Sequence, residues 1–232
     1  MELGGDQYIP RPESWRVGNP APWAHLTEGQ RHFKLGEVLT ALSDHPPARN
    51  DHIAHLKARP AAVLVALFEE DGEVRVILTK RADSMPTHRG EIVFPGGKFD
   101  PVLDADLAAA ALREAHEEIG LDAELVEVVA ELDHVATLIS AFAITPFVGV
   151  LSERPAVHAE SREVTSVFDV ALWTLFHEAT WHEERWSIPP FPGSAEGMND
   201  ASMPFFELPG ETVWGATARI LTSLLGYLAS SR

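Results

Sequence analysis

The sequence predicts an α+β fold in which a mixed β-sheet is sandwiched between α-helices, an α/β/α arrangement. Residues 61–68 and 74–78 are apolar, strand-like runs joined by the turn residues Asp71 and Gly72. Residues 104–119 carry an apolar stripe at helical spacing, and residues 211–230 form a second, more apolar helical run. Strands and helices that mix in this order favour one sheet with helices packed on its faces.

The chain begins with a segment that differs from the rest in composition. Residues 1–30 are rich in Pro and Gly and are expected to be irregular. Residues 33–42 have the spacing of a short amphipathic helix. We therefore divide the chain into an N-terminal extension, residues 1–55, and a main domain, residues 56–232.

A short strand and a glycine loop precede the central helix. Residues 91–94 are expected to be a strand that leads into Pro95-Gly96-Gly97, where the lack of side chains allows a close approach. The helix 104–119 has Asp104 as its expected N-cap, and Gly120 supplies its stop, because glycine adopts the left-handed conformation cheaply.

The second half of the chain continues the alternation. Residues 125–132, 139–151 and 164–172 contain strands, and the run 139–151 is apolar enough to be central in the sheet. Residues 181–210 hold many aromatic residues and prolines, and we expect a long ordered loop there before the last helix.

Composition excludes several classes of function. The 232 residues contain no cysteine, which excludes disulfides, thiolate catalysis and Cys-ligated zinc. The longest apolar run, residues 61–68, is far shorter than a bilayer span, and the polar N-terminus has no signal-peptide core. A cytoplasmic protein without a membrane partner is therefore expected. The net charge of −17 argues against nucleic-acid binding.

A cluster of carboxylates lies on the helix 104–119. Glu114, Glu117 and Glu118 are spaced i, i+3 and i+4, so they share one helix face and repel one another unless a cation lies among them. A lone cluster of this kind is more often a solvated face, but here it borders the apolar stripe. Arg113 is one turn from Glu117 and can pair with it. Hard divalent ions prefer such oxygen ligands and keep positions for phosphate oxygens.

The segment around this cluster resembles the box of the Nudix hydrolases, which cleave nucleoside diphosphates linked to another group. The box runs Gly, five residues, Glu, seven residues, then Arg-Glu-apolar-any-Glu-Glu-any-Gly-apolar. Residues 113–121, Arg-Glu-Ala-His-Glu-Glu-Ile-Gly-Leu, match the second half at every specified position. The first half departs, because fifteen residues separate Gly97 from Arg113 where the pattern has thirteen. Asp104 and Asp106 are the candidates to replace the missing first Glu.

A second resemblance concerns the coenzyme A pyrophosphatase branch of this family. The run Leu78-Thr79-Lys80-Arg81-Ala82, then Gly90 and Phe94-Pro95-Gly96-Gly97, is similar to the motif that precedes the box in that branch. Pro86 stands where the branch has its second Arg, and His88, Arg89 or Lys98 could supply the missing charge. Residues 144–148 and 213–218 also resemble the branch.

These resemblances imply a Nudix fold and a metal-dependent pyrophosphohydrolase that uses Mg²⁺ or Mn²⁺. The expected substrate is coenzyme A or acyl-coenzyme A, cleaved to phosphopantetheine and adenosine 3′,5′-bisphosphate. Two alternatives stay open: a Nudix pyrophosphatase for ADP-ribose, NADH or another dinucleotide, and a non-catalytic Nudix-fold module that only binds a ligand. The expected catalytic residues are Arg113, Glu114, Glu117 and Glu118, and the three glutamates are also the expected metal ligands.

The anionic substrate of an acidic protein needs local positive charge. The basic residues before the helix are the candidates, together with the glycine loop. We expect substrate contacts from Lys80, Arg81, His88, Arg89, Gly96, Gly97 and Lys98. The general base stays open between Glu114, Glu163 and another loop acid. The expected partner is a small-molecule nucleotide, and a homodimer stays open.

Overall fold

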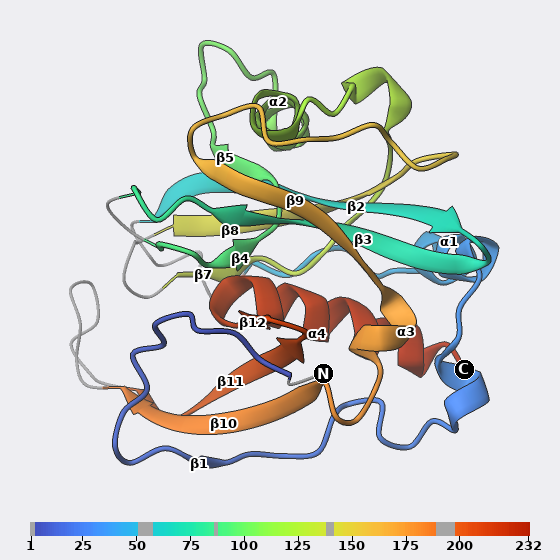
Figure 1. Ribbon diagram of the computed structural model, residues 1–232. Helices are drawn as coiled ribbons and strands as arrows, with labels where there is room; N and C mark the ends of the chain where they lie inside the picture. Colours follow the sequence, from blue (N-terminus) through green and yellow to red (C-terminus); the bar gives the residue numbers. More distant parts are fainter. Residues whose placement is uncertain (1–2, 51–57, 86–87, 138–141, 189–197) are drawn as a thin grey trace.

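The computed structural model describes residues 3–50, 58–85, 88–137, 142–188 and 198–232. These residues form four layers (Figure 1). Helix α2 (Leu107–Ile119) covers one face of an eight-stranded sheet, and α4 (Gly215–Ser230) covers the other face. A four-stranded sheet packs on the far side of α4. The expected mixed sheet between helices is confirmed, and the second sheet is an addition to it.

The large sheet is mixed, as expected. Its main path runs β4-β3-β2-β8-β6, and β5, β7 and β9 pair with β2, β8 and β3. Strands β2 and β8 are parallel, and the other described pairs are antiparallel. The strands are β2 (Arg59–Glu70), β3 (Glu73–Arg81), β4 (Ile92–Val93), β5 (Gly96–Lys98), β6 (Glu127–Glu131), β7 (Val135–Ala136), β8 (Phe142–Val150) and β9 (Val164–Ala171).

Strand β2 divides the core between the two faces of the sheet. Leu64 and Ala66 pack with α2, whereas Val65 and Leu67 belong to the larger cluster that contains α4. Successive side chains of a strand point to opposite faces, so a continuous apolar run is required when both faces are covered. The turn into β3 has positive φ at Asp71 (52°) and Gly72 (77°), the conformation that suits a tight hairpin.

Helix α2 begins later than the sequence indicated. Its N-cap is Asp106, whose side chain accepts a hydrogen bond from the backbone N–H of Ala109. The expectation that Asp104 is the N-cap is therefore wrong, because its carboxylate is engaged elsewhere. The helix ends as expected at Gly120, which has a φ of 68°.

The expectation of a long loop over residues 181–210 is wrong for the described residues. Strands β10 (Trp181–Ile188), β11 (Met198–Leu208) and β12 (Glu211–Val213) form the small sheet with β1 (Arg16–Val17). Aromatic side chains are buried on both faces of this sheet, Trp181 and Phe206 on the face toward the α4 cluster and Trp186 and Phe205 on the other. Pro189, Pro190 and Pro192 lie outside the described residues, between β10 and β11.

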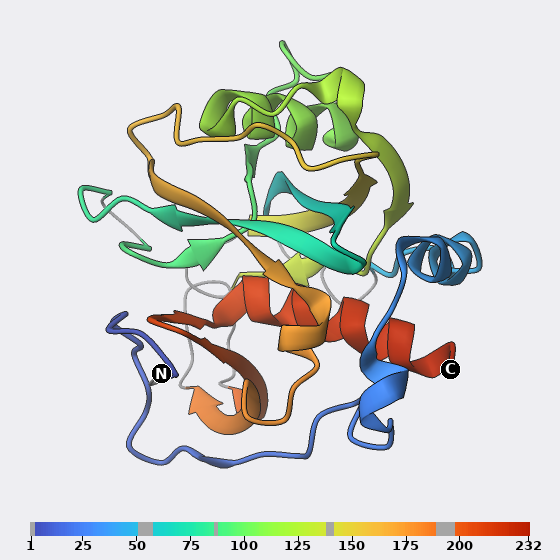
Figure 2. The same ribbon diagram turned by 45° about the vertical axis from the view of Figure 1, so that its right-hand side comes forward.

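The N-terminal extension is mostly irregular, as expected, and runs along the outer side of the small sheet (Figure 2). Its Trp23 is fully buried and belongs to the same core cluster as α4. The short helix η1 (Glu28–Arg31) precedes α1 (Leu35–Ser43), close to the helix expected at 33–42. The boundary at residues 55 and 56 lies outside the described residues and stays a prediction.

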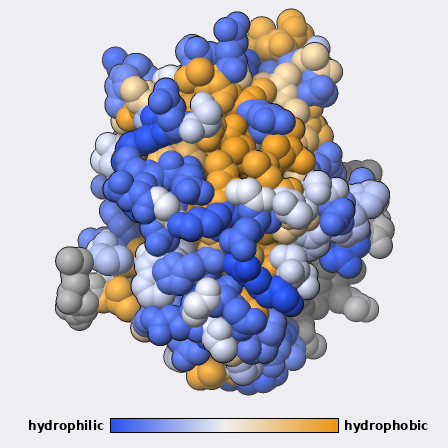
Figure 3. Space-filling model, turned by 90° about the vertical axis from the view of Figure 1, so that its right-hand side faces the viewer, coloured by the Kyte–Doolittle hydropathy of each residue, from blue (hydrophilic) through white to orange (hydrophobic). Residues whose placement is uncertain are grey.

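The two remaining short helices are η2 (Ala123–Leu125), after α2, and α3 (Leu172–Leu175), after β9. Figure 3 shows hydrophobic residues in the upper half of one face and mainly hydrophilic residues in its lower half. Of the helices in the described part of the chain, none combines the length and apolar character needed to cross a membrane.

Candidate active site

The site is built where the last turns of α2 meet strand β5. Gly96 and Gly97 pair with Val63 and Ala62 of β2, which brings their backbone under the helix. Gly96 has a φ of 154°, and a Cβ there would lie 2.6 Å from the Cα of Val63. A Cβ at Gly97 would overlap the carboxylate of Glu114. Both glycines are therefore required by the close approach of chain and carboxylate.

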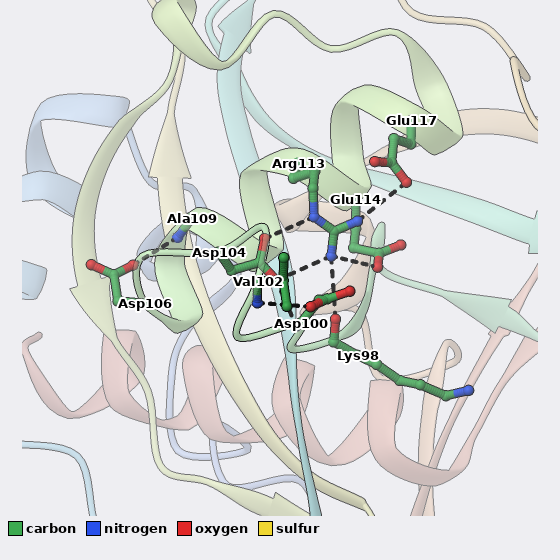
Figure 4. Close-up of polar contacts among 9 residues, drawn as sticks. All are labelled: Lys98, Asp100, Val102, Asp104, Asp106, Ala109, Arg113, Glu114 and Glu117. Atoms are coloured by element: carbon green, nitrogen blue, oxygen red, sulfur yellow. Dashed lines mark hydrogen bonds and ion pairs between the residues drawn. The ribbon is translucent and has the colours of Figure 1, made fainter.

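Arg113 is the hub of the polar contacts on this helix (Figure 4). Its guanidinium donates to both carboxylate oxygens of Asp104, at 2.7 and 3.2 Å, and to Glu114 at 2.9 Å. It also donates to Glu117 at 3.2 Å and to the carbonyl of Lys98 at 3.3 Å. The hydrogen bond to Asp104 is the largest cause of a raised pKa of Arg113. Arg113 thus fixes the direction of two of the three carboxylates.

Asp104 and Asp106 have different tasks, which the sequence left open. The Asp104 side chain is 1% exposed, and its Oδ2 also accepts the backbone N–H of Asp100 at 2.8 Å. Its hydrogen bond with Arg113 lowers the pKa of Asp104. Asp106 caps the helix. Of the two candidates to replace the first Glu of the box, Asp104 is the one that contacts the Arg of the box.

Glu118 is a buried carboxylate with few partners. The residue is 5% exposed, and among the described residues the backbone N–H of Gly96 is its one hydrogen-bond donor, at 3.1 Å. Burial is the largest cause that raises the pKa of Glu118 to about 7, against the opposing hydrogen bond from Gly96. Burial also raises the pKa of Glu114. Arg113 is the counter-charge of Glu114, whereas no ion pair among the described residues holds Glu118.

Arg81 and Glu163 complete the surroundings of these carboxylates. Arg81, at the end of β3, approaches Glu163 with an Nη2–Oε2 distance of 3.4 Å, and its buried Nε has no hydrogen-bond partner in the described part of the chain. The charge of Arg81 lowers the pKa of Glu118, whereas that of Glu163 raises it. Glu163 is therefore close to the box carboxylates. Its position directly before the strand 164–172 was the only sequence signal for this.

The other predicted substrate residues are not all gathered here. Lys80, the residue before Arg81 on β3, points to the opposite face of the sheet and pairs with Glu211 of the small sheet at 2.7 Å. His88, which has a φ of 58°, pairs with Glu91, and this hydrogen bond raises the pKa of His88. Arg89 donates to the carbonyl of Met85, and the exposed Lys98 side chain extends away from Arg113 (Figure 4). Pro86 lies outside the described residues.

Among the residues that the structure describes, no three His, Asp or Glu side chains already converge as a metal site. Glu117, half exposed, is turned toward Arg113, while Glu118 is turned toward Gly96. The donor set nevertheless fits a hard divalent cation. It supplies carboxylate oxygens, two of them desolvated, beside a glycine cradle that a Cβ would fill.

A cavity of about 450 Å³ lies elsewhere, between β9 and the turn from β11 to β12. Its charged lining residues are Arg75, Asp169 and Glu211. Arg75 pairs with Asp169, and Glu211 with Lys80. Because these charges are neutralised within the protein, the cavity does not compete with the α2 carboxylates as the place for charged chemistry.

Comparisons with known proteins agree with the geometry. A model of the NUDIX domain matches residues 58–192. An uncharacterized Nudix hydrolase NudL of Enterobacter sp. is 40% identical over 127 residues, which cover 55% of this chain and 65% of that protein. A protein of the same name from Klebsiella pneumoniae is 35% identical over 194 residues, which cover 84% of this chain and 94% of that protein.

The mouse peroxisomal coenzyme A diphosphatase NUDT7 is 38% identical over 132 residues, which cover 57% of this chain and 55% of that protein. The chain spans less than two thirds of the length of several curated relatives that it matches, including the Enterobacter protein.

Proposed function

The chain belongs to the Nudix family, and from this premise we propose that it is a divalent-metal-dependent pyrophosphohydrolase that acts on coenzyme A or its thioesters. The products would be phosphopantetheine, or its acylated form, and adenosine 3′,5′-bisphosphate. The observation that carries the proposal is the group of α2 carboxylates beside Gly96 and Gly97, in which Arg113 directs Glu114 and Glu117 while Glu118 is buried against the backbone of Gly96.

Glu114 and Glu118 are the residues that would hold the divalent ion, with Glu117 beside them. When bound, Mg²⁺ or Mn²⁺ would neutralise the charge that develops on the phosphate oxygens. The chain itself positions the groups. Arg113 directs Glu114 and Glu117, Asp104 holds Arg113, and the backbone N–H of Gly96 holds Glu118. Little covalent chemistry is asked of the protein, because positioning and electrostatics carry the rate of such reactions.

In the reaction, the oxygen of water forms a bond to one phosphorus of the diphosphate, and the bond from that phosphorus to the bridging oxygen breaks. The bridging oxygen leaves with the other phosphate. Glu163 takes the proton of the water in our proposal, because it is half exposed and lies outside the helix while close to the box carboxylates.

The choice of coenzyme A rests on two supports. The first is the motif around Arg81, a residue whose guanidinium lies near Glu118 and whose buried Nε has no partner among the described residues. Such a fork is suited to gripping a phosphate with parallel hydrogen bonds. The second is the similarity to a mouse protein named as a coenzyme A diphosphatase.

A turnover screen tests this proposal. Purified protein with Mg²⁺ or Mn²⁺ would be incubated with coenzyme A, acyl-coenzyme A, ADP-ribose, NADH and capped nucleotides, in water labelled with ¹⁸O. We expect the highest kcat/KM with a coenzyme A species and label in a phosphate of one product. Better turnover of ADP-ribose or NADH would refute the substrate, and label in a free carboxylic acid would mean thioesterase chemistry instead. Binding without turnover of any compound would indicate a ligand-binding module.

A further inference from the structure

Arg219 on α4 has no acidic partner among the residues that the structure describes. Its Nη1 donates to the carbonyl of Ala136 on β7 at 3.2 Å. Within the described ranges, this is its only hydrogen bond, and no carboxylate pairs with it, although most arginines there have an acidic partner. A guanidinium has five N–H donors, so most of the fork is left for another group.

The energetics of this position favour an anion. Arg219 is partly buried, and this burial lowers its pKa. A desolvated guanidinium with one neutral partner is costly, because its charge has lost water and gained little in return. In a chain with 35 acidic residues, an acidic partner would be easy to provide. The geometry therefore indicates a place where an anion binds from outside the chain.

The position of Arg219 separates it from the candidate metal ligands. Ala136 pairs with Ala143 of β8, which pairs with Pro60 of β2, and β2 in turn pairs with the glycines of β5. Three strand spacings of about 4.8 Å place β7 about 14 Å from β5. Figure 1 shows the first turns of α4 beneath β7, on the face of the sheet opposite α2.

Other cations lie along the same edge of the sheet. Phe142, paired with Arg59, begins β8. The Cζ of Arg59 lies 4.3 Å from the centre of the Phe142 ring, and the Nζ of Lys98 lies 6.0 Å from it. Phe142 shares its strand face with Ile144, which packs against the cluster that contains α4. Two cations, Arg59 and Lys98, therefore lie near the start of β8, between β5 and β7, in a protein that is otherwise strongly acidic.

We propose that Arg219 binds an anionic group of the substrate that is remote from the scissile diphosphate, a phosphomonoester such as the 3′-phosphate of coenzyme A. This inference rests on the proposed function and extends it, because it assigns recognition of the second phosphate group to α4. The Arg fork donates two N–H groups to phosphate oxygens while Nη1 stays on the carbonyl of Ala136. Dephospho-coenzyme A, which lacks the 3′-phosphate, is then the poorer substrate.

The test compares ligands with and without that phosphate. Calorimetry without divalent ions would measure Kd for adenosine 3′,5′-bisphosphate and for AMP in wild type, Arg219→Gln and Arg219→Lys. We expect wild type to prefer the bisphosphate by about tenfold, as for one charged hydrogen-bond pair. Arg219→Gln should lose this preference, and Arg219→Lys should keep part of it. Arg16→Gln, which removes an exposed arginine of β1, is the matched control and should keep all of it.

Steady-state kinetics of the metal-bound enzyme test the role of Arg219 independently. The KM ratio of dephospho-coenzyme A to coenzyme A should fall toward one in Arg219→Gln, while thermal unfolding shows that the variant is folded. If coenzyme A is hydrolysed and Arg219→Gln keeps the wild-type ratio, the inference is overturned and the proposed function stands. If coenzyme A is not hydrolysed, the proposed substrate is wrong. The calorimetry then decides alone, and equal binding of bisphosphate and AMP by wild type overturns the role of Arg219.

Discussion

The small sheet and helix α2 each contain a buried glutamate, and the two glutamates differ in their hydrogen-bond and ion-pair partners. Glu184 of the small sheet is 1% exposed and accepts hydrogen bonds from Arg11, at 2.7 and 2.9 Å, and from the Trp186 indole at 2.7 Å. Glu118 of α2 is 5% exposed and, in the described part of the chain, accepts one backbone N–H. Glu184 forms an ion pair with Arg11, whereas Glu118 forms none with the residues that the structure describes.

This difference separates a structural carboxylate from a functional one. A buried charge that is paired and hydrogen-bonded fixes a local arrangement, and here it ties the N-terminal extension to β10. A buried charge without a counter-ion is a cost that the fold retains, and such residues concentrate at functional sites. The comparison predicts that loss of Glu118 harms activity and loss of Glu184 harms stability.

The largest effect is expected for Glu118→Gln. The amide keeps the size of the side chain but removes the charge that would hold the metal, so kcat should fall by on the order of 10² or more. The melting temperature in the absence of metal should stay or rise, because an unpaired buried charge is gone. Glu117→Gln should also lower kcat. Steady-state kinetics check this, with EDTA-treated wild type as reference, and full activity in both variants would refute the assignment.

The converse result is expected for Glu184→Gln. Replacing the charged acceptor weakens its bonds with Arg11 and Trp186, so the free energy of unfolding should fall by about 2 kcal/mol. Denaturant unfolding measures this loss, and kcat per folded molecule should match wild type. A large fall in kcat with unchanged stability would mean that the small sheet, rather than α2, carries the chemistry.

A smaller effect is expected for Arg81→Ala, which tests the substrate side of the α2 region. Removing a charged hydrogen bond to phosphate should raise KM for coenzyme A by about tenfold. Arg154→Ala is the matched control, because Arg154 pairs with Glu70 at the far end of β2. Pro86→Arg, which restores the residue of the branch motif, should leave activity equal or improve it. An unchanged KM in Arg81→Ala, with ADP-ribose as the better wild-type substrate, would refute the branch assignment.

The smallest effect is expected for Asp104, whose contribution to the free energy of unfolding should depend on pH. Arg113 lowers the pKa of Asp104 in the folded state, below its ordinary value of 3.8. The stabilisation is therefore present above pH 3.8 and is lost as the pH falls through the folded pKa. Asp104→Asn should lose stability at pH 6 but differ less from wild type at pH 3. Unfolding at both pH values checks this, and a constant difference would mean that the ion pair contributes nothing.

Much of the site followed from the sequence, because helical spacing and glycine stops are local signals. The carboxylates on one face of α2, the stop at Gly120 and the turn at Asp71-Gly72 depend only on neighbouring residues. The opposite placement of Lys80 was also available, because Val74, Val76, Leu78 and Lys80 alternate along β3 and the first three pack against the α4 cluster.

Other features needed the tertiary structure. Asp104 and Asp106 are equivalent acids in the sequence, and only the packing of the loop on α2 gives one to Arg113 and the other to the helix end. Residues 181–188 and 198–208 form strands because their aromatic side chains are buried on both faces of a sheet that the N-terminal segment extends. No sequence motif marks Arg219, because its proposed role depends on a ligand and on the tertiary contact with β7.

The most direct test of the account is the effect of divalent cations on thermal stability. A cation that binds only the folded protein raises the melting temperature, and the rise grows with the logarithm of its free concentration above Kd. Wild type and Glu184→Gln should therefore show the same rise in melting temperature with increasing Mn²⁺ or Mg²⁺, and Glu118→Gln should show little or none. If the melting temperature rises equally in Glu118→Gln, or does not rise in wild type, the claim that Glu118 is a ligand of the metal ion is contradicted.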